Sequence, residues 1–425
     1  MAEVNLRDMV QKARGAAHDS GLLPSGVRDG VLEEIAQRLD EVGDELWEAN
    51  EADVAEAKEA GVAAPLVDRS TLTPEKVASM AQGCRDVAAL EDPLGKVFDG
   101  KTLPNGLYVA KKRVPLGVLG VIFESRPNVT IDISALCIKT GNGVILRGGK
   151  ESLRTNIVLV DLIKDACEAS GVPAHAIQLI TSTDRSLVPE LLGMDDLIDL
   201  IIPRGGPGLQ GLVRQHAKMP VVYGGIGVCH LYVDASAEVE RSIPVIHNAK
   251  TQAPSVCNSL DTVLVHQDAV DELMPPMVAA LNESGVKVLC DEPSMRALEG
   301  AEEIDPDLVE SATEDDYGQE FLSLVLSVKV VDSVDEAIAH IGEYGTNHSD
   351  GILTNDYKNA MRFLNAVDSA ATYVNASTRF TDGGQFGLGA EVAISTQRMH
   401  ARGPMGPEEL TTYKWIIQGD YHARD

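Results

Sequence analysis

The spacing of apolar residues divides the chain into a helical first part and a longer part in which strands and helices alternate. In residues 1–95, apolar side chains recur at steps of three and four, which places them on one face of a helix. These positions are Val27, Val31, Ile35, Leu39, Val42 and Leu46. Thr73-Pro74-Glu75 combines a capping hydroxyl, a proline and an acid, the pattern of a helix start. The first part is therefore predicted to be a set of amphipathic helices.

Two turn signals follow, Asp99-Gly100 and Pro104-Asn105-Gly106, and they flank a strand-like stretch at Leu107–Val109. Glycine and asparagine accept the backbone conformations of tight hairpin turns. We therefore expect a small hairpin over residues 98–114 that stands out from the first domain.

From Val118 onward, short apolar runs alternate with amphipathic stretches. The expected strands are 118–123, 144–146, 177–180, 197–202 and 228–233, and the expected helices are 130–140, 152–170 and 209–217. Strands that are apolar on both faces and alternate with helices predict a parallel sheet covered on both sides.

The same alternation starts again after Asp234. The expected helices are 237–250, 270–284, 337–344 and 357–366, and the expected strands are 262–265, 287–289, 324–330, 351–353 and 371–374. The stretch 291–320 is acidic and predicts a solvated surface. The fold class is thus α/β, with two doubly wound open-sheet domains and the hairpin. The expected domains are 1–233 and 234–375, followed by a C-terminal segment, 376–425.

Composition narrows the function. The 425 residues contain 36 Lys and Arg against 65 Asp and Glu, a net charge of −29. So acidic a chain should repel nucleic acid and anionic membranes, and an anionic substrate would need a local basic pocket. The six cysteines lie far apart without metal-like spacing, which favours a reducing compartment and neither a disulfide framework nor a metal site. With no apolar signal region in residues 1–15 and no run of membrane length, we expect a cytoplasmic protein.

The turn around Cys257 is the first candidate for chemistry. Ser255, Asn258 and Ser259 surround the thiol, and Pro254 stiffens the approach. Backbone N–H groups and hydroxyls in such a turn favour the reactive thiolate and can hold an oxyanion after it attacks a carbonyl. The alternative is a buried cysteine that acts only as a small hydrophobe.

A polar turn at the carboxyl end of strand 118–123 holds two more candidates. Open α/β sheets bind ligands at this end of their strands. Arg126 could hold an anion and Asn128 could donate an amide N–H to an oxyanion. The alternative for Asn128 is that it caps the next helix.

Two further turns suit a cofactor. Lys150 follows strand 144–146 and could reach a ribose or its phosphate, although a solvated lysine is an equal alternative. Residues 206–211 fit G-x-G-x-x-G after a strand, but Pro207 removes one N–H. Arg204-Gly205-Gly206 adds a cation beside a flexible turn, which suits an anion.

A glycine-rich loop over residues 375–391 follows the last expected strand. Its Arg379 is another candidate anion ligand, because the loop otherwise avoids charge; the alternative is an ordinary surface arginine.

Taken together, these segments resemble the aldehyde dehydrogenase superfamily nearly end to end, and within it the enzymes that reduce an acyl phosphate. The segments that carry the resemblance are Val118–Asn128, Asn142–Ser152, Asp199–Gly206, Val228–Asp234, Asn347–Asp350 and Phe386–Gly406.

The resemblance implies an NADPH-dependent reduction of L-glutamate 5-phosphate to L-glutamate 5-semialdehyde and phosphate, the second step of proline biosynthesis. Cys257 would be the nucleophile that forms a thioester, and Asn128 with the Cys257 backbone N–H would hold the oxyanion. Lys150 would contact the adenosine ribose and Glu320 the nicotinamide ribose.

By the same resemblance, residues 1–233 would bind the dinucleotide and 234–375 would carry the nucleophile. Segment 376–425 would return to the cofactor domain and the subunit interface. The Arg204–Gly206 turn is a better cofactor candidate than the literal glycine motif, and Arg126 and Arg379 are substrate candidates. The hairpin and the strand-like segment 411–417 would serve a homo-oligomer, and functional pairing with glutamate 5-kinase is expected.

One departure from the superfamily separates the alternatives. Hydrolytic members carry a glutamate before a Gly-Gly as the base that activates water, whereas Tyr223-Gly224-Gly225 stands at that place here. A thioester that must be protected from water should lack that base. A hydrolytic, NAD-linked aldehyde dehydrogenase is therefore the second hypothesis. A cysteine hydrolase or acyltransferase using His230 or His247, and a non-catalytic scaffold, follow it.

Overall fold

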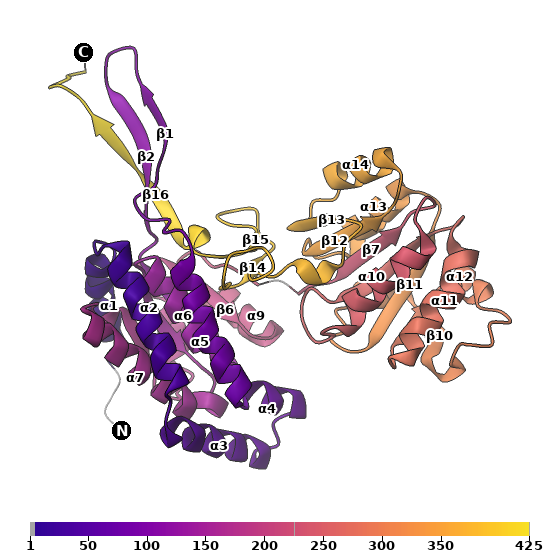
Figure 1. Ribbon diagram of the computed structural model, residues 1–425, viewed down its shortest axis with the longest axis horizontal. Helices are drawn as coiled ribbons and strands as arrows, with labels where there is room; N and C mark the ends of the chain where they lie inside the picture. The colour runs from indigo at the N-terminus through magenta and orange to yellow at the C-terminus, as the bar shows by residue number, and fades with distance from the viewer. Residues whose placement is uncertain (1–4, 225, 425) are drawn as a thin grey trace. The chain divides into compact units, whose positions relative to one another are not determined.

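The computed structural model describes residues 5–224 and 226–424, and these form two compact units. Unit 1 comprises the described residues up to Gly224 together with 387–393 and 405–424, and unit 2 comprises those up to Phe386 together with 394–404 (Figure 1). The sequence-based boundary at Asp234 differs from this division. Strand β7 (Cys229–Val233) precedes Asp234 but pairs with β8 (Leu260–His266) and β12 (Ser349–Leu353) in the sheet of unit 2.

The centre of unit 1 is a four-stranded parallel sheet in the order β5-β4-β3-β6. Its strands are β3 (Val118–Phe123), β4 (Gly143–Arg147), β5 (Ile177–Leu179) and β6 (Leu200–Arg204). Every residue of β3 is buried, as expected for a central strand covered on both faces. The chain moves from β3 to β4 to β5 and then returns past β3 to β6, so the connecting helices lie on opposite faces of the sheet.

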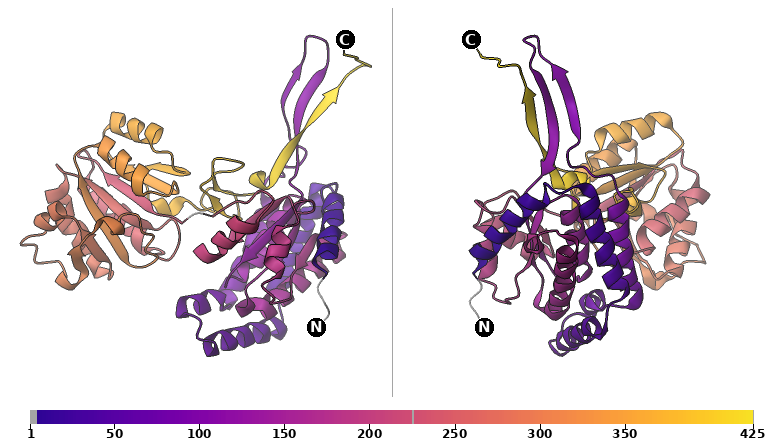
Figure 2. Two further views of the ribbon diagram at one scale, coloured as in Figure 1. Left: turned by 180° about the vertical axis from the view of Figure 1, so that it is seen from behind. Right: turned by 60° about the vertical axis from the view of Figure 1, so that its left-hand side comes forward.

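Helices cover this sheet in layers (Figures 1 and 2). They are α1 (Leu6–Ser20), α2 (Ser25–Asp40), α3 (Asp44–Glu59), α4 (Ala64–Ser70), α5 (Pro74–Ala89), α6 (Asn128–Lys139), α7 (Leu153–Ser170), α8 (Leu187–Leu192) and α9 (Pro207–His216). Apolar residues of α1, α8 and α9 share one core with Val118 and Ile122 of β3. The helices α2, α3 and α5 pack on α6 and α7 and form an outer layer.

Three antiparallel strands form a second sheet in unit 1. The expected hairpin is confirmed as β1 (Val97–Thr102) and β2 (Tyr108–Pro115). The strand expected at 411–417 is β16 (Thr411–Gln418), and it pairs with β2 of the same chain from Thr411↔Pro115 to Gln418↔Tyr108. The C-terminal segment therefore completes this sheet within the chain, and β1 and β16 form its edges (Figure 1).

Unit 2 is built on seven parallel strands in the order β10-β9-β11-β8-β7-β12-β13. The strands not yet given are β9 (Lys287–Cys290), β10 (Val309–Ser311), β11 (Val325–Val331) and β13 (Ala371–Val374). The helices are α10 (Val239–Thr251), α11 (Val270–Glu283), α12 (Glu292–Ala297), α13 (Val334–Tyr344) and α14 (Tyr357–Ala366). A two-stranded ribbon of β14 (Ile394–Ser395) and β15 (Gly403–Pro404) also belongs to this unit.

The two faces of this sheet have separate cores, which follows from the alternation of side chains along a strand. In β7, Leu231 and Val233 pack into the core that includes α10 and α11 residues. The intervening Tyr232 packs into the core formed with α13 and α14 residues. Unit 2 is thus a doubly wound sheet with helices on both faces, as the sequence predicted.

The expectation for 291–320 was incomplete. The stretch holds α12 and the edge strand β10 in addition to exposed loops. Both elements are short, and an acidic background hides a three-residue strand from any periodicity argument. In the described part of the chain, no helix is long and apolar enough to cross a membrane.

Candidate functional site

The thiol of Cys257 lies in the turn between α10 and β8, and it differs in exposure from the other cysteines. Cys84, Cys137, Cys167, Cys229 and Cys290 are buried, whereas Cys257 is half-buried. Burial raises the pKa of the Cys229 thiol well above its ordinary value, so that thiol stays protonated. Cys257 is therefore the cysteine that can meet a substrate.

Hydrogen bonds from a distant segment hold this turn in place. The 3₁₀ helix η5 (Thr378–Phe380) lies against it: Thr378 Oγ1 donates to the Asn258 carbonyl at 2.8 Å, and Asn258 Nδ2 donates to the Thr381 carbonyl at 2.8 Å. The neighbouring Cys229 Sγ donates to the Cys257 carbonyl at 3.3 Å. These contacts come from residues far apart in the sequence, so the turn is fixed by the fold of unit 2.

A buried ion pair between Lys250 and Asp261 flanks the Cys257 turn. Lys250, in the last turn of α10, donates from Nζ to the Leu260 carbonyl at 2.9 Å and lies 3.5 Å from Asp261 Oδ1. Burial raises the pKa of Asp261 to about 6, and Lys250 opposes that shift. Burial also lowers the pKa of Lys250, with Asp261 opposing it. Because each charge is removed from water, loss of one partner would leave the other uncompensated next to the turn.

Glu320 reaches the same region through Gly227. Gly227 donates its N–H to Glu320 Oε1 at 2.9 Å. A Cβ atom on Gly227 would lie 1.6 Å from the Cys257 carbonyl oxygen, so the backbone here tolerates no side chain. Burial raises the pKa of Glu320, and the Gly227 N–H partly offsets that effect. The structure thus brings Cys257, Gly227 and Glu320 together within unit 2.

Arg379 also lies beside the nucleophile turn. Its Nε donates to Oε1 of Gln252, the residue that follows α10, at 2.7 Å. By contrast, Arg398 and Arg402 both pair with Asp368, and their guanidinium groups lower the pKa of that carboxyl. Of these three arginines, Arg379 is the one placed at the Cys257 turn.

Neither histidine suggested as a partner for Cys257 is oriented for that task. His230 is fully buried, and its Nδ1 is 2.9 Å from Asp350 Oδ1. His247 has its two ring nitrogens within hydrogen-bond distance of Ser284 and Thr251. A cysteine–histidine dyad of this kind is therefore disfavoured.

The turn after β3 in unit 1 is stabilised by a carboxylate. Ser125 adopts a positive φ of 46°, and both its N–H and its hydroxyl donate to Glu151 Oε1 at 2.8 Å. Arg126, half-buried, comes next in this turn. A non-glycine residue in the left-handed region costs free energy, and the two bonds to Glu151 offset that cost.

Asn128 is the first residue of α6, and its side chain does not cap the helix. Its Nδ2 donates to Asp132 Oδ2 at 2.9 Å, one turn later on the helix. Pro127 is the N-cap and no side-chain cap bond is present at this end. The capping alternative for Asn128 is therefore wrong, and its exposed amide remains a candidate for the oxyanion.

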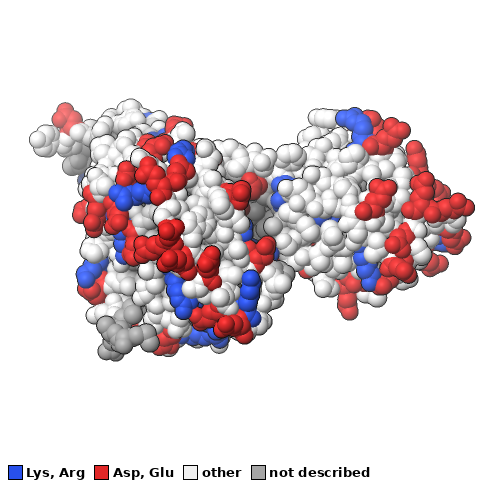
Figure 3. All heavy atoms as spheres, turned by 60° about the horizontal axis from the view of Figure 1, so that its bottom comes forward, with Lys and Arg blue, Asp and Glu red and all other residues white. Residues whose placement is uncertain are grey.

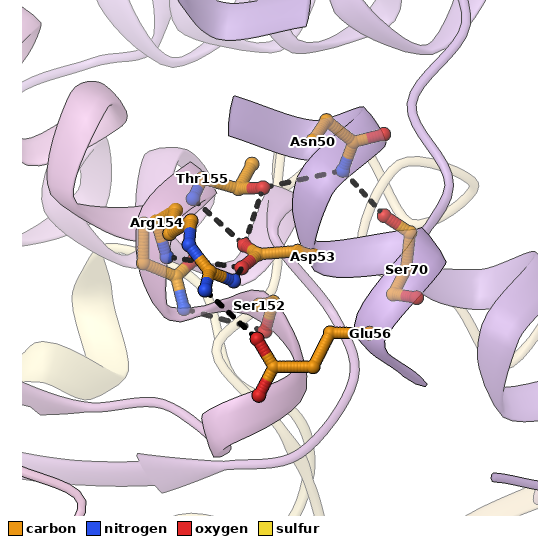
Figure 4. A network of polar contacts seen from close by, with 8 residues as sticks. Asn50, Asp53, Glu56, Ser70, Ser152, Arg154 and Thr155 are labelled. Atoms are coloured by element: carbon orange, nitrogen blue, oxygen red, sulfur yellow. Dashed lines mark hydrogen bonds and ion pairs between the residues drawn. The ribbon is translucent and has the colours of Figure 1, made fainter. Parts of the chain in front are cut away.

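Lys150 is exposed at the start of a 3₁₀ turn, η1 (Lys150–Ser152), after β4. The helix that follows, α7, has its N-terminus satisfied by the protein itself (Figure 4). Asp53 of α3 accepts from the Thr155 N–H and hydroxyl, both at 2.9 Å, and from Arg154 Nη1 at 3.0 Å. A carboxylate thus takes the place at this helix end that a phosphate could fill, and the network fixes the segment that carries Lys150.

The Arg204–Gly206 turn joins β6 to α9. Gly206 donates its N–H to Glu124 Oε2 at 3.2 Å, and a Cβ on Gly205 would lie 2.5 Å from the same oxygen. The N–H expected to meet a cofactor phosphate therefore already has a carboxylate partner. Around Gly208 and Gly211 a Cβ would meet nothing within 4 Å, so the literal glycine motif has no structural requirement for glycine there.

Tyr223 packs against α9, with the Arg214 guanidinium 5.2 Å from its ring centroid. This cation–π contact gives the residue before Gly224 a packing role.

Sequence reasoning missed three residues that contact the candidate site residues. They are Gly227 in unit 2, and Asp132 and Glu124 in unit 1. The expected helix 130–140 contained Asp132 but began after Asn128; because α6 begins at Asn128, the two residues lie one helical turn apart. Gly227 and Glu124 make contacts across the fold that no local pattern indicates.

Comparison with known proteins places the chain in a family. The model of the aldehyde dehydrogenase family matches residues 1–297, and the chain belongs to this family. It is 52% identical over 419 residues to gamma-glutamyl phosphate reductase from Escherichia coli O1:K1, which covers 99% of this chain and all of the relative. The same identity and coverage hold for a gamma-glutamyl phosphate reductase from Shigella flexneri.

Solved structures agree. The crystal structure of gamma-glutamyl phosphate reductase from Thermotoga maritima has a TM-score of 0.94 at 44% identity, covering 99% of this chain and 100% of that chain. An acetylating aldehyde dehydrogenase from Geobacillus thermoglucosidasius has a TM-score of 0.72 at 18% identity, covering 99% and 97%, and it shows the fold alone. The sequence-based resemblance and the fold class are both confirmed.

Proposed function

We propose that this chain reduces L-glutamate 5-phosphate to L-glutamate 5-semialdehyde with NADPH and releases phosphate, the second step of proline biosynthesis. The names of its relatives over the full chain support this substrate. The observation that carries the proposal is the half-buried Cys257 in a polar turn, among five buried cysteines.

In the proposed reaction, the Cys257 thiolate attacks the acyl carbonyl of the substrate. The bond from that carbon to the phosphate oxygen breaks, phosphate leaves, and a thioester forms. The chemistry that NADPH would supply when bound is the hydride that reduces the thioester carbonyl. The resulting thiohemiacetal collapses as the carbon–sulfur bond breaks, which releases the aldehyde and restores the thiolate.

Backbone and amide donors would stabilise the two oxyanions of this sequence. The N–H of Cys257 and the Nδ2 of Asn128 are the proposed donors, and donors of this kind are worth about 3–4 kcal/mol in a transition state. Asn128 is suited to this because its amide is exposed and does not serve as a helix cap.

The proposed cofactor residues of unit 1 follow or end strands β4 and β6, at the edge where open α/β sheets bind ligands. Lys150 and Arg204 would hold the anionic groups of NADPH, with the Gly205–Gly206 turn beside them. Glu124 would give up its bond to the Gly206 N–H if a phosphate binds there. Glu320 in unit 2 would accept from the nicotinamide ribose, and its raised pKa fits a carboxylate already shielded from water.

Arg126 and Arg379 are the proposed ligands of the substrate's charged groups. Arg379 is supported by its contact with Gln252 at the Cys257 turn. Arg126 is supported by its place in the turn that Glu151 fixes. A guanidinium can bind phosphate or carboxylate through two parallel hydrogen bonds.

Self-association and functional pairing with glutamate 5-kinase are also part of the proposal. The three-stranded sheet of unit 1 supports self-association because β16, at its edge, exposes Tyr413, Trp415 and Ile417. Exposed apolar side chains on an edge strand are typical of a surface that pairs with another chain.

Replacing the nucleophile tests the proposal. The assay follows NADP⁺ reduction with L-glutamate 5-semialdehyde and phosphate. Cys257→Ser should lower kcat by at least about a thousandfold, because a hydroxyl is a far weaker nucleophile at neutral pH. Cys167→Ser, at a buried position of α7, is the matched control and should retain kcat. Substantial turnover by Cys257→Ser would remove the assignment of the nucleophile.

A further inference from the structure

Helix α6 carries a carboxylate that no step of the proposed reaction uses. Asp132 is half-buried, and within the described part of the chain the amide of Asn128 is its hydrogen-bond donor, at 2.9 Å between Nδ2 and Oδ2. No ion pair with a lysine or arginine is formed by Asp132 among the described residues. A carboxylate that is partly removed from water without a direct cation costs free energy, so its presence requires a reason.

The surroundings of Asp132 come from three elements. Asn128 lies on the same helix as Asp132. The positive charge of Arg204, at the end of β6, opposes the rise in the pKa of Asp132 that burial causes. On α5, a Cβ at Gly83 would lie 4.0 Å from Asp132 Oδ1. Besides burial, the negative charge of Asp132 raises the pKa of the neighbouring Cys84 thiol. Burial raises the pKa of that thiol to about 12, so Cys84 is neutral near pH 7. Burial raises the pKa of Asp132 to about 6, against the opposing effects of Asn128 and Arg204.

The hydrogen bond to Asp132 has one consequence for Asn128. A primary amide has an oxygen acceptor on one side and two N–H donors on the other, and a half-turn exchanges them. An ionised carboxylate accepts hydrogen bonds and cannot donate one. It therefore selects the orientation in which Nδ2 faces Asp132, and the second N–H of the same nitrogen remains available.

We propose that Asp132 is a positioning residue that sets the amide orientation of Asn128, so that an N–H and not the carbonyl oxygen is presented to the substrate oxyanion. This inference rests on the proposed role of Asn128. The positive charge of Arg204 offsets part of the negative charge that Asp132 places near the oxyanion. The proposal assigns Asp132 no contact with the substrate.

A double-mutant cycle tests it, with kcat and KM measured for NADP⁺ reduction by L-glutamate 5-semialdehyde and phosphate. Asp132→Asn keeps the shape but can accept or donate, so it no longer selects one amide orientation. We expect Asp132→Asn to lower kcat about tenfold or more while KM for NADP⁺ stays unchanged, and Asn128→Ala to lower kcat further. In the Asn128→Ala background, Asp132→Asn should have no additional effect.

The thermal stability of Asp132→Asn separates a positioning role from a structural role. If Asp132 served only to stabilise the fold, its replacement would lower Tm. Because the folded pKa of Asp132 is above its ordinary value, the folded protein holds this proton more tightly than the unfolded chain. The fold therefore loses stability as the pH rises from near that ordinary value to about 6. Asp132→Asn should therefore keep or raise Tm, and its advantage over the native protein should grow between about pH 4 and pH 6 and then level off. Activity should fall although stability does not.

Each other result contradicts the inference. Unchanged kcat in Asp132→Asn would mean that Asp132 does not orient the amide. Additive losses in the cycle would mean that Asp132 acts on the reaction directly. A loss confined to aldehydes that carry an α-amino group would make Asp132 an ammonium ligand instead. Full activity of Asn128→Ala would remove the oxyanion assignment, and this inference with it, while leaving the Cys257 test intact.

Discussion

Cys257 owes its exposure and its position to neighbours that lie far from it in the sequence. Gly227 passes so close that a Cβ would overlap the Cys257 carbonyl oxygen, and Thr378 and Thr381 hold the adjacent Asn258 from another segment. The polar composition of the turn was enough to make Cys257 a candidate nucleophile. The same composition could not identify Gly227, because a close contact between two distant backbone segments produces no pattern in the local sequence.

At this scale, Gly227→Ala should impair the nucleophile without touching a reacting group. The new methyl group would force the Cys257 backbone to move, and a displacement of about 1 Å at a catalytic group can cost about a hundredfold in rate. We expect kcat to fall at least about tenfold, measured in the semialdehyde assay. Gly342→Ala in α13, where a Cβ meets nothing within 4 Å, is the control and should keep kcat. Equal kcat for the two variants would contradict the close packing at Gly227.

Lys150 allows a second test at the scale of the residue. Lys150→Gln should raise KM for NADP⁺ by about tenfold or more, because a hydrogen bond from a charged donor is worth about 1.5–3 kcal/mol. The KM for the semialdehyde should change much less. Lys58→Gln, an exposed lysine of α3, removes the same charge elsewhere and should leave both constants unchanged. Equal changes in both KM values would mean that Lys150 acts only through its general electrostatic effect and does not bind the cofactor.

At the scale of elements, the contact between α3 and α7 fixes the segment that carries Lys150, a proposed cofactor ligand. Asp53 is almost fully buried and satisfies N–H groups at the start of α7, immediately after the turn that carries Lys150 (Figure 4). The outer layer of helices therefore does more than cover the sheet. Asp53 of the outer helix α3 accepts hydrogen bonds at the N-terminus of the inner helix α7.

Removing that side chain should destabilise unit 1. Asp53→Ala leaves the buried N–H and hydroxyl of Thr155 without their carboxylate acceptor, and we expect a loss of about 2–4 kcal/mol in the free energy of unfolding. Glu56→Ala removes the exposed partner of Arg154 and should cost less than about 1 kcal/mol. Urea unfolding measures both. Similar losses for the two variants would show that Asp53 does not cap α7.

Periodicity predicted most elements but not their assignment to sheets. The run 118–123 coincides with β3, and the expected helices appear with ends shifted by a few residues. The boundary at Asp234 was misplaced because β7 is buried on both faces, and such a strand carries no signal for the sheet it joins. Strand β10 was missed because three residues are too few for a periodic pattern.

At the scale of the whole molecule, a net charge of −29 surrounds the proposed anion-binding groups. Acidic side chains are spread over the faces of both units that Figure 3 shows. A field of this sign repels anionic substrates and cofactors at a distance, so the proposed binding would depend on short-range contacts with Lys150, Arg126, Arg204 and Arg379. The acidic surface supports solubility and carries no part of the proposed chemistry.

The central claim is that phosphate, and not water, exchanges with the acyl group on Cys257. The measurement that tests it most directly is NADP⁺ reduction with L-glutamate 5-semialdehyde, with and without inorganic phosphate. We predict an absolute requirement for phosphate, because Tyr223 precedes Gly224 where a hydrolytic enzyme carries a glutamate base. Sustained turnover in phosphate-free buffer would mean that water resolves the thioester and that the chain is a hydrolytic aldehyde dehydrogenase.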